Sequence, residues 1–386
     1  MTCRKTTSEC KNVNDAVTNG HLKCFKRFHT AKSLNLWGNK ICNSAAKNGY
    51  LDCLVYAYEK GYKFSRWTCA YAAKNGHLEC LKYAHDNGCP WDEWTCIYAA
   101  KYGHLECLKY AHQNECPWNI ETCLYAARNG HLKCLVYAHE NGCLWNEDTC
   151  VSAAKNGHLK CLVYAHENGC PWNAWTCAHA AENGYLDCLI YAHENGCPWN
   201  AWTCNFASDT GQLECLVYAH ENGCEWDKWS CVRAAENGHL DCLKYAHENG
   251  CRWDKWICAK AAEYGHLDCL VYAHTNGCRW DAWTCDLATD NGHLECLEYA
   301  HENGCPCIHN TGKLKIYSTK LDTTTDNEDI QCGICYEKRN KVQFIPCNHT
   351  LCIGCSNKII TRQYPQIKCP FCRGKVEENL PLPYYN

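Results

Sequence analysis

The hydrophobic pattern of this chain repeats at a fixed interval. The sequence Gly-His-Leu-Glu-Cys-Leu recurs with small variations, and after the first interval the step between copies is always 27 residues. The copies begin at Gly20, Gly49, Gly76, Gly103, Gly130, Gly157, Gly184, Gly211, Gly238, Gly265 and Gly292. A fixed period in this range is typical of supersecondary units that stack and pack mainly on their neighbours. We therefore expect most of the chain to form a repeat solenoid.

The pattern within one copy, from Trp91 to Cys116, predicts two helices joined by a tight turn, and no strand. Apolar residues of the first helix have the i, i+3, i+4 spacing of a buried stripe. The first stripe consists of Cys96, Ala99 and Ala100, and the second helix turns Leu105, Leu108 and Ala111 inward. Gly103 separates the two helices and can take the left-handed conformation that suits a helix C-terminus. The pattern thus predicts an all-α solenoid.

A residue that can cap a helix precedes the first helix of each of these copies. The carboxylate of Asp92 can accept hydrogen bonds from the amides of the first turn. The equivalent positions hold Ser65, Asn119, Asn146, Asn173, Asn200, Asp227, Asp254 and Asp281. After the second helix, Pro117 cannot continue it, and we expect Trp118 to pack the loop against the next copy.

The sequence of one copy resembles a known repeat family. The run from Ala72 to Tyr83, Ala-Ala-Lys-Asn-Gly-His-Leu-Glu-Cys-Leu-Lys-Tyr, resembles the helix pair of the ankyrin repeat. The Gly-Cys-Pro-Trp-Asp loop and the 27-residue step are similar to the shortened ankyrin-like repeats of giant DNA viruses. The ankyrin period is about 33 residues, and the missing residues fall where its β-hairpin finger would be. The resemblance therefore implies a viral protein whose binding surface is made by the first helices.

One position varies more between copies than any other. It directly precedes the paired alanines or their equivalents, and a core residue cannot vary so freely because packing responds to a single methylene. The row consists of Tyr71, Tyr98, Tyr125, Ser152, His179, Phe206, Arg233, Lys260 and Leu287. We expect this variable row to face outward and to bind a protein substrate. The main expected contacts are Tyr71, Tyr98, Tyr125, His179, Phe206 and Arg233. A solvated face without a partner is the alternative.

Cysteine, histidine and tryptophan also recur in columns, at fixed positions of the repeat. The cysteine columns are represented by Cys69, Cys80 and Cys89. No copy has a closely spaced cysteine pair, so we expect buried packing thiols rather than metal ligands or disulfides. The histidine column, represented by His85, ends each second helix, where we expect it to complement the helix C-terminus. We expect the tryptophan columns, represented by Trp91 and Trp94, to pack between copies.

Composition restricts the cellular compartment and the classes of partner that we expect. The chain has 40 cysteines and no apolar signal-peptide segment, so we expect reduced thiols in the cytoplasm or nucleus, which means the host cytoplasm for a viral protein. No run of 18 apolar residues occurs, so no membrane span is expected. Residues 330–386 contain eight Lys/Arg and three Asp/Glu, whereas the rest of the chain contains 30 Lys/Arg and 39 Asp/Glu. An acidic body argues against a nucleic-acid partner, because phosphate binding needs a basic stripe.

Four closely spaced pairs of metal ligands follow the repeats. Their order is Cys-Cys, Cys-His, Cys-Cys and Cys-Cys, at Cys332, Cys335, Cys347, His349, Cys352, Cys355, Cys369 and Cys372. Tetrahedral zinc takes four such ligands in a structural site, so eight ligands indicate two zinc ions. So short a segment cannot bury enough apolar surface to fold without metal. A zinc module of another kind is the alternative.

The order and spacing of these ligands resemble the RING finger with three cysteines, one histidine and four cysteines. In that family alternate pairs share a metal in a cross-brace. The resemblance implies one zinc at Cys332, Cys335, Cys352 and Cys355, and another at Cys347, His349, Cys369 and Cys372. It also implies an apolar groove for an E2 enzyme at Ile334, Ile359 and Pro370, and an arginine that bridges E2 and ubiquitin at Arg373.

The resemblance implies a RING-type E3 ubiquitin ligase whose solenoid captures a protein substrate. Such a ligase forms no covalent intermediate and holds the E2~ubiquitin thioester beside a substrate lysine. A binding or scaffold protein that sequesters a host factor, with a structural RING, is the alternative. The fourteen residues after Cys372, with Tyr384 and Tyr385, resemble in length the tails of dimeric RING ligases. A RING homodimer is therefore a further expectation. A disordered C-terminal end is the alternative.

These patterns divide the chain into five parts. Residues 1–40 form a degenerate first repeat and N-terminal cap, and residues 41–305 form the ankyrin-like repeats. Residues 306–329, which include a Thr-Thr-Thr-Asp-Asn-Glu-Asp run, form a polar linker. Residues 330–375 form the RING-type zinc finger, and residues 376–386 form the C-terminal tail.

Overall fold

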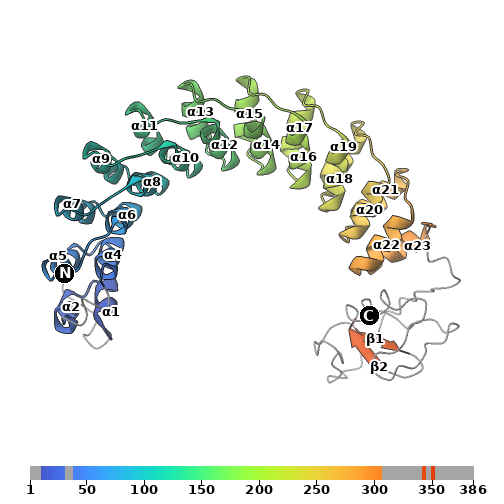
Figure 1. Ribbon diagram of the computed structural model, residues 1–386. Helices are drawn as coiled ribbons and strands as arrows, with labels where there is room; N and C mark the ends of the chain where they lie inside the picture. The colour runs from blue at the N-terminus through green and yellow to red at the C-terminus, as the bar shows by residue number, and fades with distance from the viewer. Residues whose placement is uncertain (1–9, 31–37, 307–340, 345–348, 353–386) are drawn as a thin grey trace. The chain divides into compact units, whose positions relative to one another are not determined.

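The computed structural model describes residues 10–30, 38–306, 341–344 and 349–352 (Figure 1). Within those residues the chain forms 22 helices and one two-stranded sheet, which confirms the predicted helical repeat architecture. The chain divides into two compact units, Met1–Thr203 and Cys204–Asn386, and the division falls inside α16 (Ala201–Asp209). None of the described helices is both long and apolar enough to span a lipid bilayer.

In the first unit, a first and a second helix alternate along the chain. The first helices are α1 (Val13–Thr18), α4 (Lys40–Lys47), α6 (Arg66–Lys74), α8 (Glu93–Lys101), α10 (Ile120–Arg128), α12 (Glu147–Lys155) and α14 (Ala174–Glu182). The second helices are α2 (Leu22–Phe28), α5 (Leu51–Glu59), α7 (Leu78–Asp86), α9 (Leu105–Gln113), α11 (Leu132–Glu140), α13 (Leu159–Glu167) and α15 (Leu186–Glu194). Figure 1 shows the two kinds of helix in two layers. The pair α1 and α2 lies in the segment expected to form a degenerate first repeat.

The second unit continues the same alternation. After α16, its first helices are α18 (Lys228–Glu236), α20 (Trp256–Glu263) and α22 (Ala282–Asn291). Its second helices are α17 (Leu213–Glu221), α19 (Leu240–Glu248), α21 (Leu267–Thr275) and α23 (Leu294–Glu302). Two short strands, β1 (Lys341–Phe344) and β2 (His349–Cys352), follow and pair antiparallel. Most of the expected linker and zinc finger, and all of the expected tail, lie outside the described residues.

Side-chain caps begin many of the first helices, as the sequence predicts. Oδ1 of Asp92 accepts a hydrogen bond from the Trp94 N–H at 3.2 Å, and Asn119 caps α10 in the same way. Such a cap satisfies one of the amides that the start of a helix leaves unpaired. The prediction is wrong for Asn146, whose side chain does not cap α12 and donates instead to Oδ2 of Asp148 at 3.1 Å.

The Gly-His turn between two helices is also a contact between repeats. Gly103 has a φ of +76°, in the left-handed region that glycine occupies without steric cost. A Cβ added to Gly103 would stand 2.6 Å from Nδ1 of His131, which belongs to the next repeat. Gly76 meets His104 of its next repeat in the same way. Glycine is therefore required at this turn both by its own backbone and by the neighbouring imidazole.

A second glycine in each repeat, after the second helix, is under a weaker constraint. Gly88 has a φ of +77°, but a Cβ added there would meet nothing within 4 Å. In one repeat Glu115 takes the equivalent position with a φ of 64°. This turn needs a left-handed residue but has room for a side chain.

Small buried side chains line the contacts between repeats. Ala72 and Ala73 of α6 are fully buried, and so are the equivalent alanines of later first helices. The neighbouring first helices α6 and α8 contact each other more extensively than the second helices α7 and α9 do. Leu81 of α7 and Leu108 of α9 are also fully buried. Each repeat thus completes its core against the next one, as expected for a solenoid.

The cysteine columns are buried, and no disulfide links the cysteines between Cys10 and Cys305 that the structure describes. This confirms the expected packing role. The third column has an additional role, because the Cys116 thiol donates a hydrogen bond to the Asp92 carbonyl oxygen at 3.3 Å. The equivalent Cys143 thiol lies 3.1 Å from its acceptor carbonyl. These thiols tie the loop after the second helix to the start of the first helix of the same repeat.

The histidines that end the second helices stack on tryptophans. The rings of His112 and Trp118 are 3.9 Å apart with an interplanar angle of 10°. Tyr137 of the next repeat meets His112 edge-on, and its hydroxyl lies 3.1 Å from Nδ1 of His112. Burial lowers the pKa of His112, so its ring carries no charge at neutral pH. Trp118 packs between repeats as predicted, and His112 lies in the last turn of α9 as predicted.

Burial shifts the pKa of repeat side chains in two directions. It raises the pKa of Cys107 and of Cys134 to about 12 from the usual 9.0. It lowers the pKa of His77 and of His104 from the usual 6.5. In both cases an apolar site penalises the charged form.

We expect the repeats to be most stable between about pH 6.5 and about pH 9. Above the usual thiol pKa of 9.0 the unfolded chain loses protons before the buried thiols do, so the free energy of unfolding falls as pH rises. Below the usual imidazole pKa of 6.5 the unfolded chain binds protons first, so this free energy falls as pH falls. Urea unfolding followed by far-ultraviolet circular dichroism at several pH values measures this dependence. Unchanged stability from neutral pH to about pH 11 would contradict the assignment of the buried thiols.

The two glycine columns give a matched pair of variants. Gly103→Ala and Gly88→Ala each place a side chain at a left-handed residue, which costs about 1–2 kcal/mol. Gly103→Ala must also displace His131, so we expect it to lower the free energy of unfolding by about 1–3 kcal/mol more. Urea unfolding of the two variants measures the difference. Equal losses would show that the turn does not hold the repeats together.

Candidate functional site

The expected zinc ligands lie mostly outside the described residues. Two of them, His349 and Cys352, are the first and last residues of β2. In the register of the hairpin, Phe344 of β1 stands opposite His349, and Lys341 stands opposite Cys352. Two residues therefore lie between the two ligands, which are three strand positions or about 10 Å apart along the backbone.

This separation bears on which ligands can share a metal. Zinc–ligand distances of about 2.0–2.3 Å place two ligand atoms of one ion within about 4 Å of each other. Residues at opposite ends of a short strand suit two different zinc ions better than one. The backbone is thus compatible with the expected alternation, in which Cys352 binds the first zinc and His349 binds the second.

The other residues expected to act in the zinc finger fall outside the described residues. They are the ligands Cys332, Cys335, Cys347, Cys355, Cys369 and Cys372, the groove residues Ile334, Ile359 and Pro370, Arg373, and the tail residues Tyr384 and Tyr385. Their roles stay predictions.

The variable row lies on the first helices, and none of its members is buried. Its members in the first unit are Tyr71, Tyr98, Tyr125, Ser152 and His179, and those in the second unit are Phe206, Arg233, Lys260 and Leu287. Each is half-buried, and in most repeats an alanine pair buried in the stack follows it directly. Such a side chain is packed on one side and accessible on the other, which is the arrangement that a recognition residue requires.

In the first unit, aromatic and cationic side chains surround the variable row. The ring of Trp94 lies 5.4 Å from that of Tyr98, one helical turn further along α8. The ammonium group of Lys74 lies 5.5 Å from the ring of Tyr98 and 5.2 Å from the ring of Tyr102. These contacts hold Tyr98 in place, which lowers the entropy that it would lose on binding a partner.

A second lysine has the same relation to the next tyrosine of the row. The ammonium group of Lys101 lies 4.8 Å from the ring of Tyr125. In the described part of the chain, neither Lys74 nor Lys101 forms an ion pair. A cation held over a tyrosine ring gains about 0.5–1 kcal/mol at an exposed site, which leaves most of its charge for a partner. This part of the face is therefore both aromatic and positively charged.

Much of the second tryptophan column is exposed, although Trp175 and Trp202 of neighbouring repeats contact each other as expected, with ring centroids 6.4 Å apart. Trp94 itself is half-buried, but the side chains of Trp175 and Trp202 in the first unit are 45% and 48% exposed. In the second unit the exposure rises from 41% at Trp256 to 56% at Trp283. The column lies four residues before the variable row on each first helix, and residues at i and i+4 share a helix face. The tryptophans therefore widen the candidate binding face.

In the second unit, ion pairs hold two members of the variable row, Arg233 and Lys260. Arg233 pairs with Glu236 at 2.9 Å and approaches Asp209 at 3.8 Å. Lys260 pairs with Glu263 at 2.7 Å and lies 3.6 Å from Glu236. A single exposed ion pair contributes little, but this set connects α16, α18 and α20. Ion pairs flank the variable row in both units, since Lys155 lies 3.7 Å from Glu182 in the first unit.

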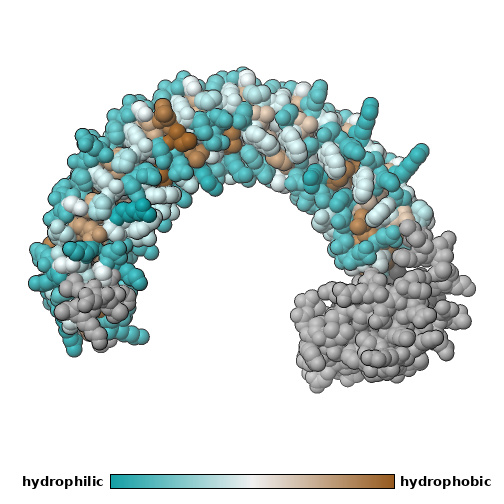
Figure 2. Space-filling view, viewed as in Figure 1, coloured by the Kyte–Doolittle hydropathy of each residue, from teal (hydrophilic) through white to brown (hydrophobic). Residues whose placement is uncertain are grey.

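The exposed residue types of this face are those that dominate protein interfaces. Figure 2 shows hydrophobic residues reaching the surface in small areas among polar ones. Tryptophan, tyrosine and arginine contribute most of the binding energy in measured protein complexes. The first-helix face, defined in each unit as the variable row together with the exposed tryptophans, therefore has residue types suited to contact with a protein.

Two tryptophans of one repeat test the division between packing and exposed columns. Trp226 stacks on His220 at 3.9 Å, whereas Trp229 is 46% exposed. We expect Trp226→Ala to lower the free energy of unfolding by about 2–4 kcal/mol, because it removes a partly buried ring. We expect Trp229→Ala to change it by less than about 0.5 kcal/mol. Chemical unfolding of both variants measures this, and a large loss in Trp229→Ala would assign that column to the core.

Comparison with protein families identifies both parts of the chain. Residues 328–379 match the family described as zinc finger, C3HC4 type (RING finger). Residues 69–112 and 96–139 match the family described as ankyrin repeats (many copies). The chain therefore carries a RING-type zinc finger and ankyrin repeats, as the sequence predicts, and the RING type implies zinc binding.

Relatives of known type match over short segments. E3 ubiquitin-protein ligase AIRP2 of Arabidopsis thaliana is 47% identical over 47 residues, which are 12% of this chain and 18% of that protein. E3 ubiquitin-protein ligase RNF168 of Homo sapiens is 38% identical over 55 residues, 14% of this chain and 9% of that protein. Putative RING finger protein 157L of Invertebrate iridescent virus 6 is 33% identical over 64 residues, 15% of this chain and 38% of that protein. This chain thus spans less than two fifths of each of these relatives.

A solved structure of the human ASB11 ankyrin repeat domain also matches, with 16% identity and a TM-score of 0.36. The match covers 41% of this chain and 84% of that domain. At this TM-score we draw nothing further from it, and the ankyrin assignment rests on the family match over α6 to α11.

Proposed function

We propose that this protein is a RING-type E3 ubiquitin ligase that captures a protein substrate on its first-helix face. One observation carries the proposal: a RING finger similar to those of E3 ligases and ankyrin repeats are on the same chain. A RING supplies no nucleophile of its own. It would hold the E2~ubiquitin thioester beside a lysine of the bound substrate, so that catalysis comes from proximity and orientation.

Two zinc ions would fold the RING. The first would bind Cys332, Cys335, Cys352 and Cys355, and the second would bind Cys347, His349, Cys369 and Cys372. Four-ligand sites leave no position for a substrate, so the metal supplies folding energy rather than chemistry. The positions of His349 and Cys352 at opposite ends of β2 support this division.

The E2 enzyme would bind a shallow groove next to these ligands. The groove residues would be Ile334, Ile359 and Pro370. Arg373, directly after the last ligand, would hold the conjugate in its reactive arrangement. Arginine suits this role because its planar group offers five donors in a fixed geometry, which can bridge acceptors on two proteins.

The substrate would bind the first-helix face. The main contacts would be Tyr71, Tyr98, Tyr125, His179, Phe206 and Arg233. In the first unit, the cations of Lys74 and Lys101 beside the tyrosine rings favour a partner with carboxylates among apolar groups. The buried free thiols favour the cytoplasm or the nucleus as the place of action, because thiols stay reduced there.

A binding or scaffold protein with a structural RING is the second candidate. It is favoured by the first-helix face, which can bind a partner without any transfer reaction. A RING homodimer would suit either function. The two candidates differ in one measurable property, because only a ligase accelerates ubiquitin discharge from E2.

Ubiquitin discharge by the full chain tests the ligase. With an active E2, we expect Arg373→Ala to slow discharge at least about tenfold with zinc content and E2 binding unchanged, because the arginine acts on the conjugate's geometry. Lys375→Ala, two residues further, removes a charge outside the proposed contacts and should retain discharge. His349→Ala should release zinc and abolish discharge while the repeat helices stay folded. Gel assays of E2~ubiquitin and zinc analysis measure these properties.

Two results would count against the assignments. Full discharge by Arg373→Ala would show that this arginine does not hold the conjugate. No discharge by the zinc-loaded wild-type chain with a broad panel of E2 enzymes would favour the scaffold.

A further inference from the structure

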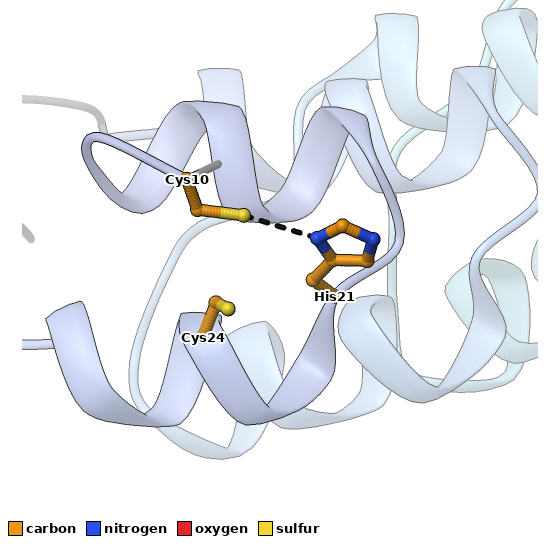
Figure 3. Close-up of side chains that lie close together, drawn as sticks. All are labelled: Cys10, His21 and Cys24. Carbon is orange, nitrogen blue, oxygen red and sulfur yellow. Dashed lines mark hydrogen bonds between the residues drawn. The ribbon is translucent and has the colours of Figure 1, made fainter. Parts of the chain in front are cut away.

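Three metal-ligating side chains of the first repeat converge on one point (Figure 3). Cys10 precedes α1, His21 lies in the turn between α1 and α2, and Cys24 belongs to α2. Sγ of Cys10 lies 3.0 Å from Nδ1 of His21. The three ligand atoms, one from each residue, all lie within 4.8 Å of one another.

These distances suit one tetrahedral metal ion. Zinc–sulfur bonds of about 2.3 Å and zinc–nitrogen bonds of about 2.0 Å place neighbouring ligand atoms about 3.5–3.8 Å apart. The distances in the cluster, from 3.0 Å to at most 4.8 Å, span those values. Small rotations of the side chains would therefore bring all three atoms to a common metal.

The residue types and their burial favour zinc over harder cations. Cys10 and Cys24 are 6% and 3% exposed, and His21 is half-buried. Thiolate and imidazole ligands suit zinc, whereas calcium and magnesium take oxygen ligands. Three protein ligands leave the fourth position of a tetrahedral ion to water.

The other repeats show that the cluster does not follow from the repeat pattern alone. His77 and Cys80 have the positions of His21 and Cys24 in a later repeat, at the same spacing. There the imidazole packs against Gly49 of the preceding repeat. Among the described residues, the first repeat is the place where three such ligands come within 4.8 Å of one another.

Cys10 makes the difference. Counted back from the Gly-His turn, its position corresponds to Arg66, the first residue of α6. Because α1 has six residues and α6 has nine, Cys10 lies before the helix rather than in its first turn. Its thiol meets Nδ1 of His21, the atom that in later repeats faces a glycine of the preceding repeat.

We propose that Cys10, His21 and Cys24 bind one zinc ion that closes the first repeat. The two thiols would lose their protons to solvent as the zinc–sulfur bonds form. The metal would join the segment before α1 to α2 and so stabilise a short helix pair. The site is separate from the RING and does not depend on ligase activity.

The zinc content of the full chain tests this site. The protein is expressed with zinc, purified in reductant, passed over a weak chelating resin and analysed for metal and protein. We expect Cys10→Ser to contain one zinc fewer per chain than the wild type. His21→Gln should lose the same single ion, and glutamine fits this turn because Gln212 occupies the equivalent position in another repeat. If Cys10→Ser does not fold, the zinc content of His21→Gln tests the proposal.

Cys53→Ser is the matched control. Cys53 has the position of Cys24 in the next repeat, is 1% exposed and lies outside the cluster, so this variant should keep the zinc content of the wild type. The measured quantity is a difference, so a RING that binds no zinc would lower all samples alike and leave the comparison intact. Equal zinc in wild type, Cys10→Ser and His21→Gln would overturn the proposal. Loss of one zinc in Cys53→Ser would also overturn it, since the losses would then reflect general destabilisation.

Discussion

The stacking of each repeat on the next is the contact on which the rest of the structure depends. A pair of nine-residue helices is too small to bury its own apolar stripe, so the burial of Ala72 and Ala73 depends on the neighbouring helices α4 and α8 that contact α6. The turn at Gly103 admits the imidazole of His131 because the glycine has no side chain. The same residue satisfies a left-handed backbone and a neighbour, which fixes the register of one repeat on the next.

This stacking also decides which surface remains for a partner. The paired alanines of the first helices are buried in contacts between repeats. The residue of the variable row that precedes each pair is half-buried at the edge of these contacts. Because the buried alanines and the Gly-His turns hold the repeats together, the side chain at this position can differ from copy to copy. It is aromatic and flanked by lysines at Tyr98, and it is part of an ion-pair set at Arg233. One architecture thereby presents both aromatic and charged side chains at equivalent positions of the proposed binding face.

Histidine shows how strongly the neighbour determines the role of a residue in this fold. His131 packs over a glycine, His112 stacks on Trp118, and His21 meets a thiol. The second unit shows the stacked arrangement at His220 and Trp226. The imidazole fits all three settings because it is flat and neutral when buried and can still act as a metal ligand. The histidine of the Gly-His turn can thus either pack against a glycine or act as a metal ligand, and the presence of Cys10 distinguishes the proposed metal site from the packed turns.

The sequence by itself determined the helix pairs, the buried alanine and cysteine columns and most caps, because these depend on spacing within one repeat. It also determined the RING ligand order, because closely spaced Cys and His pairs are visible without the fold. It did not distinguish Trp91 from Trp94, since both recur at fixed positions of the repeat and have the same side chain. Only the tertiary structure stacks the first column on histidine and leaves much of the second exposed, because burial depends on which neighbour covers the residue. The cluster at Cys10 was hidden for the same reason: its ligands come from separate segments, and folding alone brings them within reach of one metal.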